Sequence, residues 1–171
     1  DLGMMLPDPT SVSINASAEV LMDDGFDAAI ADFPPDRLVI ELTEHAAVHE
    51  YVTLSSRLAP LRAAGIKLAI DDAGAGYSGL QHIVQLQPDI IKLDMSLTRD
   101  IDSDQARRAL ASALVFYARE TGSLIVAEGV ETQSEMDTLK ALGIHRGQGY
   151  LLGRPMPPSE AAAFVRSRQA A

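Results

Sequence analysis

The sequence of 171 residues contains no cysteine and no tryptophan. Without cysteine, disulfide bonds, zinc–thiolate sites and thiol nucleophiles are excluded, and a reducing compartment is compatible with the chain. Positive charge is also scarce, since 14 Lys and Arg residues stand against 24 Asp and Glu residues, a formal net charge of −10. A protein that coats DNA or RNA needs a basic face, so neither polymer is an expected partner.

Long apolar runs are missing as well. No run approaches the roughly 18 residues of a membrane span, and the first residues do not resemble a signal peptide. The chain begins with Asp1 and not with Met, which suggests a piece of a longer protein. What is present is ordinary for a globular protein, with 47% hydrophobic and 22% charged residues. The length is that of one domain, for which about 100–200 residues are typical.

Short strand-like runs alternate with longer helical patterns along the whole chain. The pattern predicts strands at residues 11–15, 37–43, 66–71, 89–94, 123–128 and 146–151. It predicts helices at residues 17–30, 46–63, 78–86, 102–121, 132–142 and 158–168. Several of the strand segments are continuous runs of Val, Ile, Leu and Ala, as expected for parallel strands covered on both faces. Six successive βα units predict a parallel sheet with covering helices.

The ends of the helices carry their own signals. Gly65 and Gly143 each stand between a helical pattern and a strand, where a left-handed residue stops a helix. Thr132 with Glu135 three residues later predicts a capping box. The acidic segment at residues 102–105 favours a helix start.

Two architectures agree with these units: an open doubly wound sheet and a (β/α)₈ barrel. An eight-unit barrel usually takes about 250 residues, so this chain falls short by roughly 80. The number of units therefore favours the open sheet, whereas the placement of the acidic residues favours the barrel.

Polar residues gather at the carboxyl ends of the predicted strands. The candidates are Asn15, Glu41, Glu44, Asp71, Asp72, Lys92, Asp94, Glu128 and Gln148. A single acidic residue at a strand end is most often a helix cap or a solvated loop residue, but one at almost every strand end is hard to explain by packing. In a barrel these ends face one mouth, where the active sites of that fold occur. Several ionised carboxylates share one mouth only with a cation among them.

The donor atoms indicate which cation. Carboxylate and amide oxygens suit Mg²⁺, Mn²⁺ or Ca²⁺ better than zinc. The adjacent Asp71 and Asp72 are placed to bridge two ions about 3.5–4 Å apart, an arrangement that activates water for in-line displacement at phosphorus. Lys92 would then orient the water or neutralise developing charge.

The same residues lie in motifs that resemble a known family. The segments are Ser13–Ser17 (SINAS), Glu41–Glu44 (ELTE), Asp71–Ser78 (DDAGAGYS), Lys92–Asp94 (KLD), Ala127–Thr132 (AEGVET), Gln148–Leu151 (QGYL) and Arg154–Pro155. Their order and spacing resemble the EAL-domain family, bacterial cyclic di-GMP phosphodiesterases with a modified TIM-barrel fold. The resemblance implies an α/β fold, a (β/α)₈ barrel of EAL type, with about six βα units in this chain.

The resemblance also implies a metal-ligand set. Asn15, Glu41 and Asp71 would hold one divalent cation. Asp71 would bridge to a second cation, which Asp72 and Glu128 help to bind. Mg²⁺ or Mn²⁺ would support the reaction, and Ca²⁺ would inhibit it.

Further residues take roles by the same resemblance. Lys92 would contact the nucleophilic water, and Glu44 would brace the loop after the two aspartates. Asp94 and Gln148 would support the metal–water network or the ligand. Glu131 is the candidate for contact with a guanine.

The implied reaction opens one phosphodiester of cyclic di-GMP to give linear pGpG. The family resemblance further implies a homodimer, fusion to sensory or GGDEF domains, and a cytoplasmic location in bacteria, with any membrane anchor in segments outside this chain.

Two departures from the family pattern bear on activity. The Glu-Ala-Leu strand that names the family, with its metal-ligating Glu, is missing upstream of Asn15. Residues 1–171 are therefore expected to form an N-terminally incomplete EAL domain that is inactive alone, because an open barrel exposes sheet edges. Ala73 and Ala75 replace a usual Phe and a common Thr or Ser.

Two alternative functions stay open: a catalytically silent cyclic di-GMP receptor, or an unrelated metal-dependent barrel enzyme acting on another phosphate ester or an enolate.

Overall fold

The computed structural model describes residues 7, 10–42, 51–74 and 77–169. Its centre is a six-stranded sheet in which every neighbouring pair of strands is parallel. The strands are β1 (Val12–Ala16), β2 (Leu38–Leu42), β3 (Lys67–Ala73), β4 (Ile90–Leu93), β5 (Leu124–Ala127) and β6 (Arg146–Gly147). The first five lie within two residues of their predicted bounds. The sixth was predicted to reach residue 151 but ends at Gly147, and a bend and turn follow at residues 149–152.

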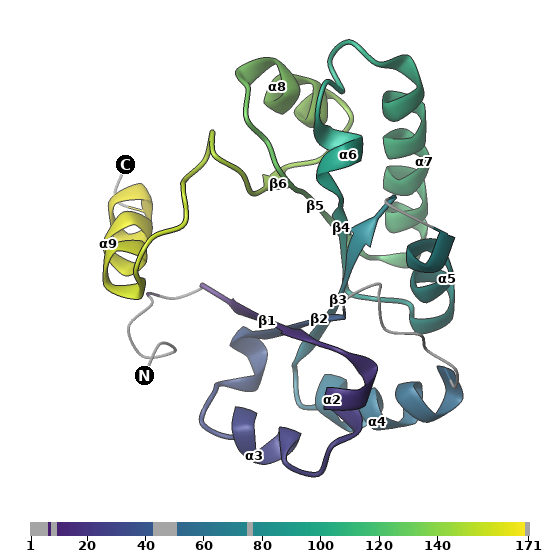
Figure 1. Cartoon of the computed structure of the whole chain (residues 1–171), viewed down its shortest axis with the longest axis vertical. Coiled ribbons are helices and arrows are strands. Elements are labelled where there is room, and N and C mark those ends of the chain that lie inside the picture. Colours follow the sequence, from purple (N-terminus) through teal and green to yellow (C-terminus); the bar gives the residue numbers. More distant parts are fainter. Residues whose placement is uncertain (1–6, 8–9, 43–50, 75–76, 170–171) are drawn as a thin grey trace.

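The order of the strands decides between the two predicted architectures. The strands lie side by side in sequence order from β1 to β6. A doubly wound sheet reverses its order at a switch point, whereas a barrel adds each strand next to the last. In Figure 1 the sheet curves, with α4, α5 and α7 on its outer side. The sheet is therefore an arc of a barrel, as the family motifs and the placement of the acidic residues predicted, and the alternative of a doubly wound sheet is excluded.

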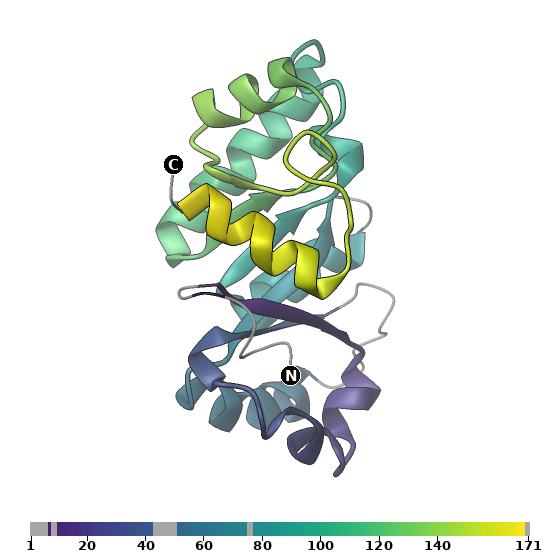
Figure 2. The ribbon, with the colours of Figure 1, turned by 90° about the vertical axis from the view of Figure 1, so that its left-hand side faces the viewer.

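Five longer helices overlap their predicted positions, although residues 46–50 of the helix predicted at 46–63 lie outside the described residues. They are α4 (Tyr51–Ala63), α5 (Tyr77–Leu86), α7 (Gln105–Thr121), α8 (Gln133–Ala141) and α9 (Pro158–Gln169). The capping box of Thr132 and Glu135 at the start of α8 is confirmed, and so are the positive φ angles of Gly65 and Gly143. Figures 1 and 2 show α9 on the open side of the arc, between β1 and β6. Among the described residues, none of the helices combines the length and the apolar character needed to cross a membrane.

Three helical details differ from the prediction. The single helix expected at residues 17–30 is two helices, α2 (Ala18–Met22) and α3 (Phe26–Ile30). Asp23 separates them, because it adopts an extended conformation and its carboxylate accepts the N–H of Gly25 at 2.8 Å, a local bond that competes with the helix. α7 begins at Gln105, three residues later than predicted, directly after its N-cap Asp104. The short helix α6 (Met95–Thr98) was not predicted.

Apolar side chains fill both faces of the sheet. The larger core lies between the strands and the outer helices and contains fully buried residues such as Ile40, Ile70 and Leu93. A second, small cluster contains Val39, Ala69 and Ile90, with Val126 packed against it. Since neighbouring residues of a strand point to opposite faces, this second cluster lies on the inner, concave face. We call it the inner floor.

Candidate active site at the carboxyl ends of the strands

Each residue of the inner floor is followed, two positions later along the chain, by a charged residue. This charged residue lies in the same strand or directly after it. These residues are Glu41 after Val39, Asp71 after Ala69, Lys92 after Ile90 and Glu128 after Val126. Side chains two positions apart share a face of a strand. The four charged groups therefore form a polar layer directly above the inner floor, on the carboxyl side, where barrel enzymes carry their active sites.

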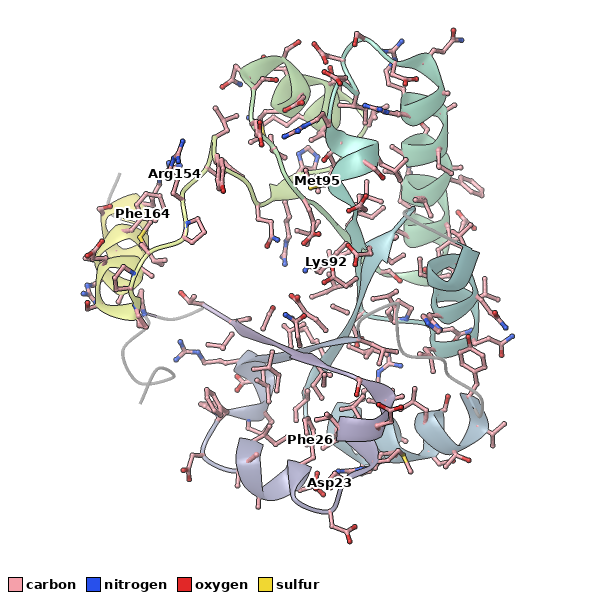
Figure 3. The ribbon with its side chains drawn as sticks, in the orientation of Figure 1. Asp23, Phe26, Lys92, Met95, Arg154 and Phe164 are labelled. Atoms are coloured by element: carbon pink, nitrogen blue, oxygen red, sulfur yellow. The ribbon has the colours of Figure 1, made fainter. Side chains whose placement is uncertain are left out.

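Lys92 is at the centre of this polar layer. Its Nζ lies 2.7 Å from Oε2 of Glu41, 2.9 Å from Oδ1 of Asp71 and 2.7 Å from Oε1 of Glu128. The Lys92 side chain is only 8% exposed and points from β4 into the concave side of the sheet (Figure 3). One ammonium group therefore joins carboxylates from three other strands.

The charges of this cluster do not balance. Burial alone would lower the pKa of Lys92, but its hydrogen bonds to Glu128, Glu41 and Asp71 outweigh burial and raise that pKa above its ordinary value. Burial raises the pKa of Glu128, and the charges of Asp71 and Glu41 add to that rise, although Lys92 opposes it. Three carboxylates around one ammonium leave two negative charges uncompensated when all are ionised. Excess negative charge in a half-buried site favours an additional cation.

A bulge in β3 brings the second aspartate to the same place. Ile70 pairs with Ile91, but the next paired residue, Ala73, stands opposite Leu93. Asp71 and Asp72 together therefore face Lys92, two residues against one, which defines a β-bulge. Asp72 has the left-handed φ of 53°, and its N–H donates to Oδ1 of Asp71 at 3.0 Å. In a regular strand the two side chains would point to opposite faces.

The bulge produces a group of oxygen atoms that fits a divalent cation. One carboxylate oxygen from each of Asp71, Asp72 and Glu128 lies within 4.8 Å of the others. All three side chains are half-buried. Oxygen donors that carry excess negative charge are the ligands preferred by Mg²⁺ and Mn²⁺.

Three further predicted residues lie near this group. Asn15 on β1 is exposed and pairs in register with Glu41 on β2. Nε2 of Gln148 donates to Oε1 of Glu128 at 2.7 Å, so Gln148, directly after β6, holds that carboxylate in place. Asp94 caps α6, where its carboxylate accepts the N–H of Ser96 at 2.8 Å.

The remaining predicted positions are less central. Glu131 forms an ion pair with Arg99 at 2.5 Å, in which both side chains are more than two-fifths exposed. Glu44 and Ala75 lie outside the described residues. Ala73 is fully buried within β3, where it pairs with Leu93.

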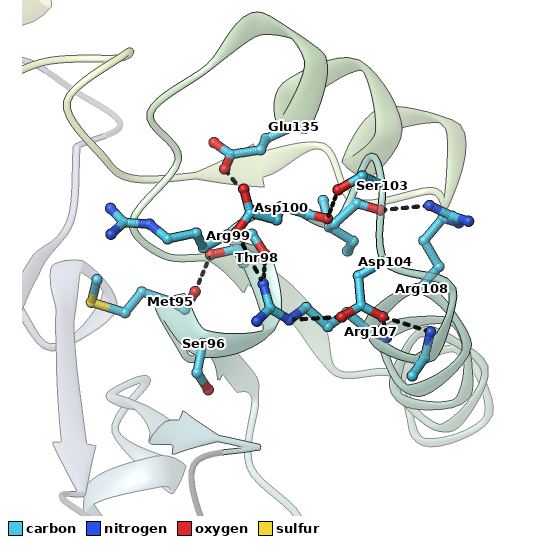
Figure 4. Close-up of polar contacts among 12 residues, drawn as sticks. Met95, Ser96, Thr98, Arg99, Asp100, Ser103, Asp104, Arg107, Arg108 and Glu135 are labelled. Atoms are coloured by element: carbon cyan, nitrogen blue, oxygen red, sulfur yellow. Dashed lines mark hydrogen bonds and ion pairs between the residues drawn. The ribbon is translucent and has the colours of Figure 1, made fainter.

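Two residues near the site were not recognised from the sequence. Thr98, at the end of α6, is fully buried, and its hydroxyl donates to the backbone carbonyl of Glu128. Glu135 was predicted as a helix cap, but its carboxylate also accepts the N–H of Asp100 from the turn after α6 (Figure 4). No local sequence signal marks either contact, because each joins segments about 30 residues apart.

The fold and the site define a class of protein: a parallel α/β barrel with an acidic, lysine-containing site for divalent cations at the carboxyl ends of its strands. Residues 2–155 match the EAL domain family. The chain therefore belongs to the EAL domain family.

A curated relative and two solved structures agree with this membership. The Cyclic di-GMP phosphodiesterase PA2567 of Pseudomonas aeruginosa is 34% identical over 164 residues, which cover 92% of this chain and 28% of the relative. The EAL domain of Mycobacterium smegmatis DcpA has a TM-score of 0.85 at 32% identity, covering 92% of this chain and 73% of that structure. A manganese and cyclic di-GMP complex of Klebsiella pneumoniae BlrP1 has a TM-score of 0.80 at 36% identity, covering 90% of this chain and 41% of that one. The chain spans less than a third of the length of the first curated relatives that it matches.

Proposed function

We propose that this chain is the larger part of a metal-dependent phosphodiesterase domain that hydrolyses cyclic di-GMP to linear pGpG. The observation that carries the proposal is the convergence of Glu41, Asp71 and Glu128 on Lys92, with Asp72 brought beside them by the bulge. A relative named as a cyclic di-GMP phosphodiesterase and a related structure with manganese and cyclic di-GMP support the choice of substrate and metal.

The proposed metal ligands are the oxygen-bearing residues of the polar layer. Asn15, Glu41 and Asp71 would hold one Mg²⁺ or Mn²⁺ ion, while Asp71 with Asp72 and Glu128 would hold the second. When bound, such a pair lowers the pKa of water and stabilises the charge of an in-line displacement at phosphorus. Ca²⁺, which accepts looser geometry and more ligands, is expected to bind and inhibit.

Lys92 acts as a hydrogen-bond donor and a fixed positive charge. Its three N–H groups face Glu41, Asp71 and Glu128, so Lys92 would donate to the attacking water after one of these carboxylates turns away. Its raised pKa keeps it protonated, so it does not accept the proton of that water. The water oxygen forms a new bond to phosphorus as the bond from phosphorus to the 3′ oxygen breaks. The departing 3′ oxygen ends with a proton, so one water is consumed for each pGpG formed.

The neighbouring residues keep the carboxylates in position. Gln148 orients Glu128 through its 2.7 Å hydrogen bond, and Asp94 begins α6 directly after the strand that carries Lys92. Glu131 is proposed to contact a guanine after release from Arg99, and Glu44 is proposed to brace the loop after Asp72.

The test is a chromatographic assay of cyclic di-GMP with Mn²⁺ or with a chelator. The assay is run on this chain and on a form extended upstream to include the Glu-Ala-Leu strand. We expect metal-dependent pGpG from the extended form and little or none from residues 1–171, an N-terminally incomplete domain. The absence of pGpG from both forms would contradict a phosphodiesterase.

The Glu128→Gln variant of the extended form tests the site itself. We expect turnover to be abolished, by a factor of at least about 100, while binding of cyclic di-GMP persists, since the amide keeps the volume but loses the charge. Glu120→Gln, at an exposed position of α7, is the matched control and should retain full turnover. A Glu128→Gln variant that still forms pGpG would remove Glu128 from its proposed role.

A silent cyclic di-GMP receptor is the second candidate. The buried Ala73 favours it, because this position lies in the bulged strand beside Asp72 and carries no aromatic side chain to anchor the following loop. A receptor would bind cyclic di-GMP in the presence of chelator and form no pGpG with Mn²⁺, as measured by calorimetry and the same chromatographic assay.

We further propose that the whole protein is a bacterial, cytoplasmic homodimer in which this domain is joined to sensory or GGDEF regions. The chain spans less than a third of the length of these relatives, which supports the presence of additional regions in the whole protein. The mass of the whole protein in light scattering, with and without cyclic di-GMP, tests the dimer.

A further inference from the structure

The short helix α6 lies between the two segments that directly follow the site carboxylates. It follows β4 at once, and Asp94 caps its first turn. On one side is the loop after Asp72, and on the other is the turn after Glu128. The contacts of Leu97, Met95 and Thr98 with these loops suggest a specific task for α6.

Close packing joins α6 to both loops through glycines. Gly74 has a φ of 110°, and a Cβ at this position would overlap Cδ1 of Leu97. Gly129 has a φ of 65°, and a Cβ there would lie 2.6 Å from Cβ of Met95. Gly74 and Gly129 therefore lie directly against α6, and neither position has room for a side chain.

Thr98 holds the backbone of Glu128 from the same helix. The Thr98 side chain is fully buried, and its Oγ1 donates to the carbonyl oxygen of Glu128. The N–H of Glu128 donates to the carbonyl of Leu93 at 3.0 Å. The β4–α6 segment thus binds the peptide groups on both sides of Glu128, whose carboxylate meets Lys92.

The far end of α6 is also anchored. Glu135 of α8 accepts the N–H of Asp100 at 3.1 Å, and Arg107 of α7 donates to the carbonyl of Arg99 and pairs with Asp100 at 3.6 Å (Figure 4). Asp94 fixes the start of α6 and these contacts fix its end. A helix held at both ends can transmit its position to Glu128 through a single hydroxyl.

We propose that Thr98 is a positioning residue that sets the place of Glu128 relative to Asp71 and Asp72. The proposal rests on the proposed function for its metal, but the backbone contact of Thr98 is independent of any metal. Outer contacts of this kind typically change metal affinity by about 10–100-fold when they are lost.

The test compares Thr98→Val with Thr98→Ser in the full 171-residue chain. Valine keeps the shape of threonine and removes the hydroxyl, whereas serine keeps the hydroxyl and removes the methyl group. Thr121→Val is the matched control, since its hydroxyl bonds backbone carbonyls at the end of α7, away from the site. Hydrogen exchange of residues 128–132 is measured without metal, and Mn²⁺ affinity is measured by calorimetry.

We expect Thr98→Val to speed exchange of residues 128–132 and to weaken Mn²⁺ binding by about tenfold. Thr98→Ser should restore both, and Thr121→Val should change neither. Unchanged exchange and unchanged affinity in Thr98→Val would overturn the positioning role, and so would a serine variant that behaves like the valine variant.

The two readouts separate this proposal from the proposed function. If the parent chain and all variants fail to bind Mn²⁺ while Thr98→Val still speeds exchange, the metal site fails and the positioning of Glu128 by Thr98 stands. If Mn²⁺ binds the parent and Thr98→Val alike, with equal exchange, the metal site stands and the role of Thr98 fails.

Discussion

The ammonium group of Lys92 holds together carboxylates that come from three different strands. Glu41, Asp71 and Glu128 would repel one another without it, since they lie within 2.9 Å of one shared nitrogen. The same group limits the chemistry of Lys92, because a raised pKa makes it a poor base. One residue therefore serves both the stability and the proposed activity of the site.

Replacing Lys92 by methionine separates these two effects. Loss of one partner from a buried ionic cluster costs about 3–5 kcal/mol, so we expect a lower melting temperature for Lys92→Met without metal. Mn²⁺ should raise the melting temperature more in the variant than in the parent chain, because the ion supplies the missing positive charge. Thermal unfolding with and without Mn²⁺ checks this. If Lys92→Met had the same melting temperature as the parent chain without metal, Lys92 would not stabilise the cluster of carboxylates.

At the scale of elements, α8 depends on a buried carboxylate with several backbone donors. Glu135 is nearly fully buried and accepts the N–H groups of Glu131, Thr132 and Asp100 at 2.9, 2.9 and 3.1 Å. Burial alone would raise the pKa of Glu135, but these backbone hydrogen bonds lower it below its ordinary value of 4.5. The carboxylate thus joins the start of α8 to the turn after α6.

The lowered pKa of Glu135 predicts in which direction acid changes the stability of the fold. The stabilisation by Glu135 is present above pH 4.5, the ordinary value, and is lost as pH falls through the lower pKa of the folded state. Glu135→Gln should cost about 1–3 kcal/mol at pH 7, since its NH₂ group faces backbone donors. Urea unfolding at several pH values should show this cost shrinking below pH 4.5. Glu120→Gln, on the exposed side of α7, should show neither effect, and a pH-independent cost at position 135 would contradict the interpretation.

The turn after β6 depends on the absence of a side chain at Gly149. Gly149 has a φ of 154°, and a Cβ there would overlap the backbone N and O of Val130. Gly149→Ala should therefore displace the turn, weaken the bond from Gln148 to Glu128 and cost about 1–3 kcal/mol beyond the conformational strain.

Gly122→Ala is the matched comparison for that variant. Gly122 has a left-handed φ of 76° but no atom within 4 Å of a Cβ, so alanine there should cost about 1–2 kcal/mol from conformation alone. Chemical unfolding of both variants gives the difference. Equal costs would show that close approach to Val130 is unimportant.

At the scale of the whole molecule, the strand order and the curvature place the polar layer. Consecutive parallel strands direct all their carboxyl ends to one side of the arc, so residues more than 50 positions apart meet at Lys92. The described strands form an arc from β1 to β6, with α9 on its open side (Figure 2). A Glu on an upstream strand beside β1 would lie next to Asn15, which is the reason for comparing the chain with its extended form.

Much of this arrangement was predictable from the sequence because it repeats with a fixed period. Apolar strand segments ending in Glu41, Asp71, Lys92 and Glu128 indicated parallel strands with a shared polar edge, and the capping box of α8 is a local pattern of four residues. The predicted length of the sixth strand was wrong because its turn is set by contact with Val130, which no local pattern contains.

The sequence by itself determined the positions of the strands, the oxygen-rich donor set and the membership of the family, since these depend on residue type and spacing. Tertiary structure alone decided that a bulge turns Asp71 and Asp72 to one face, and that Thr98 holds Glu128. The physical reason is distance along the chain: side-chain periodicity acts over a few residues, whereas register, bulges and buried hydroxyl contacts depend on segments that meet only after folding.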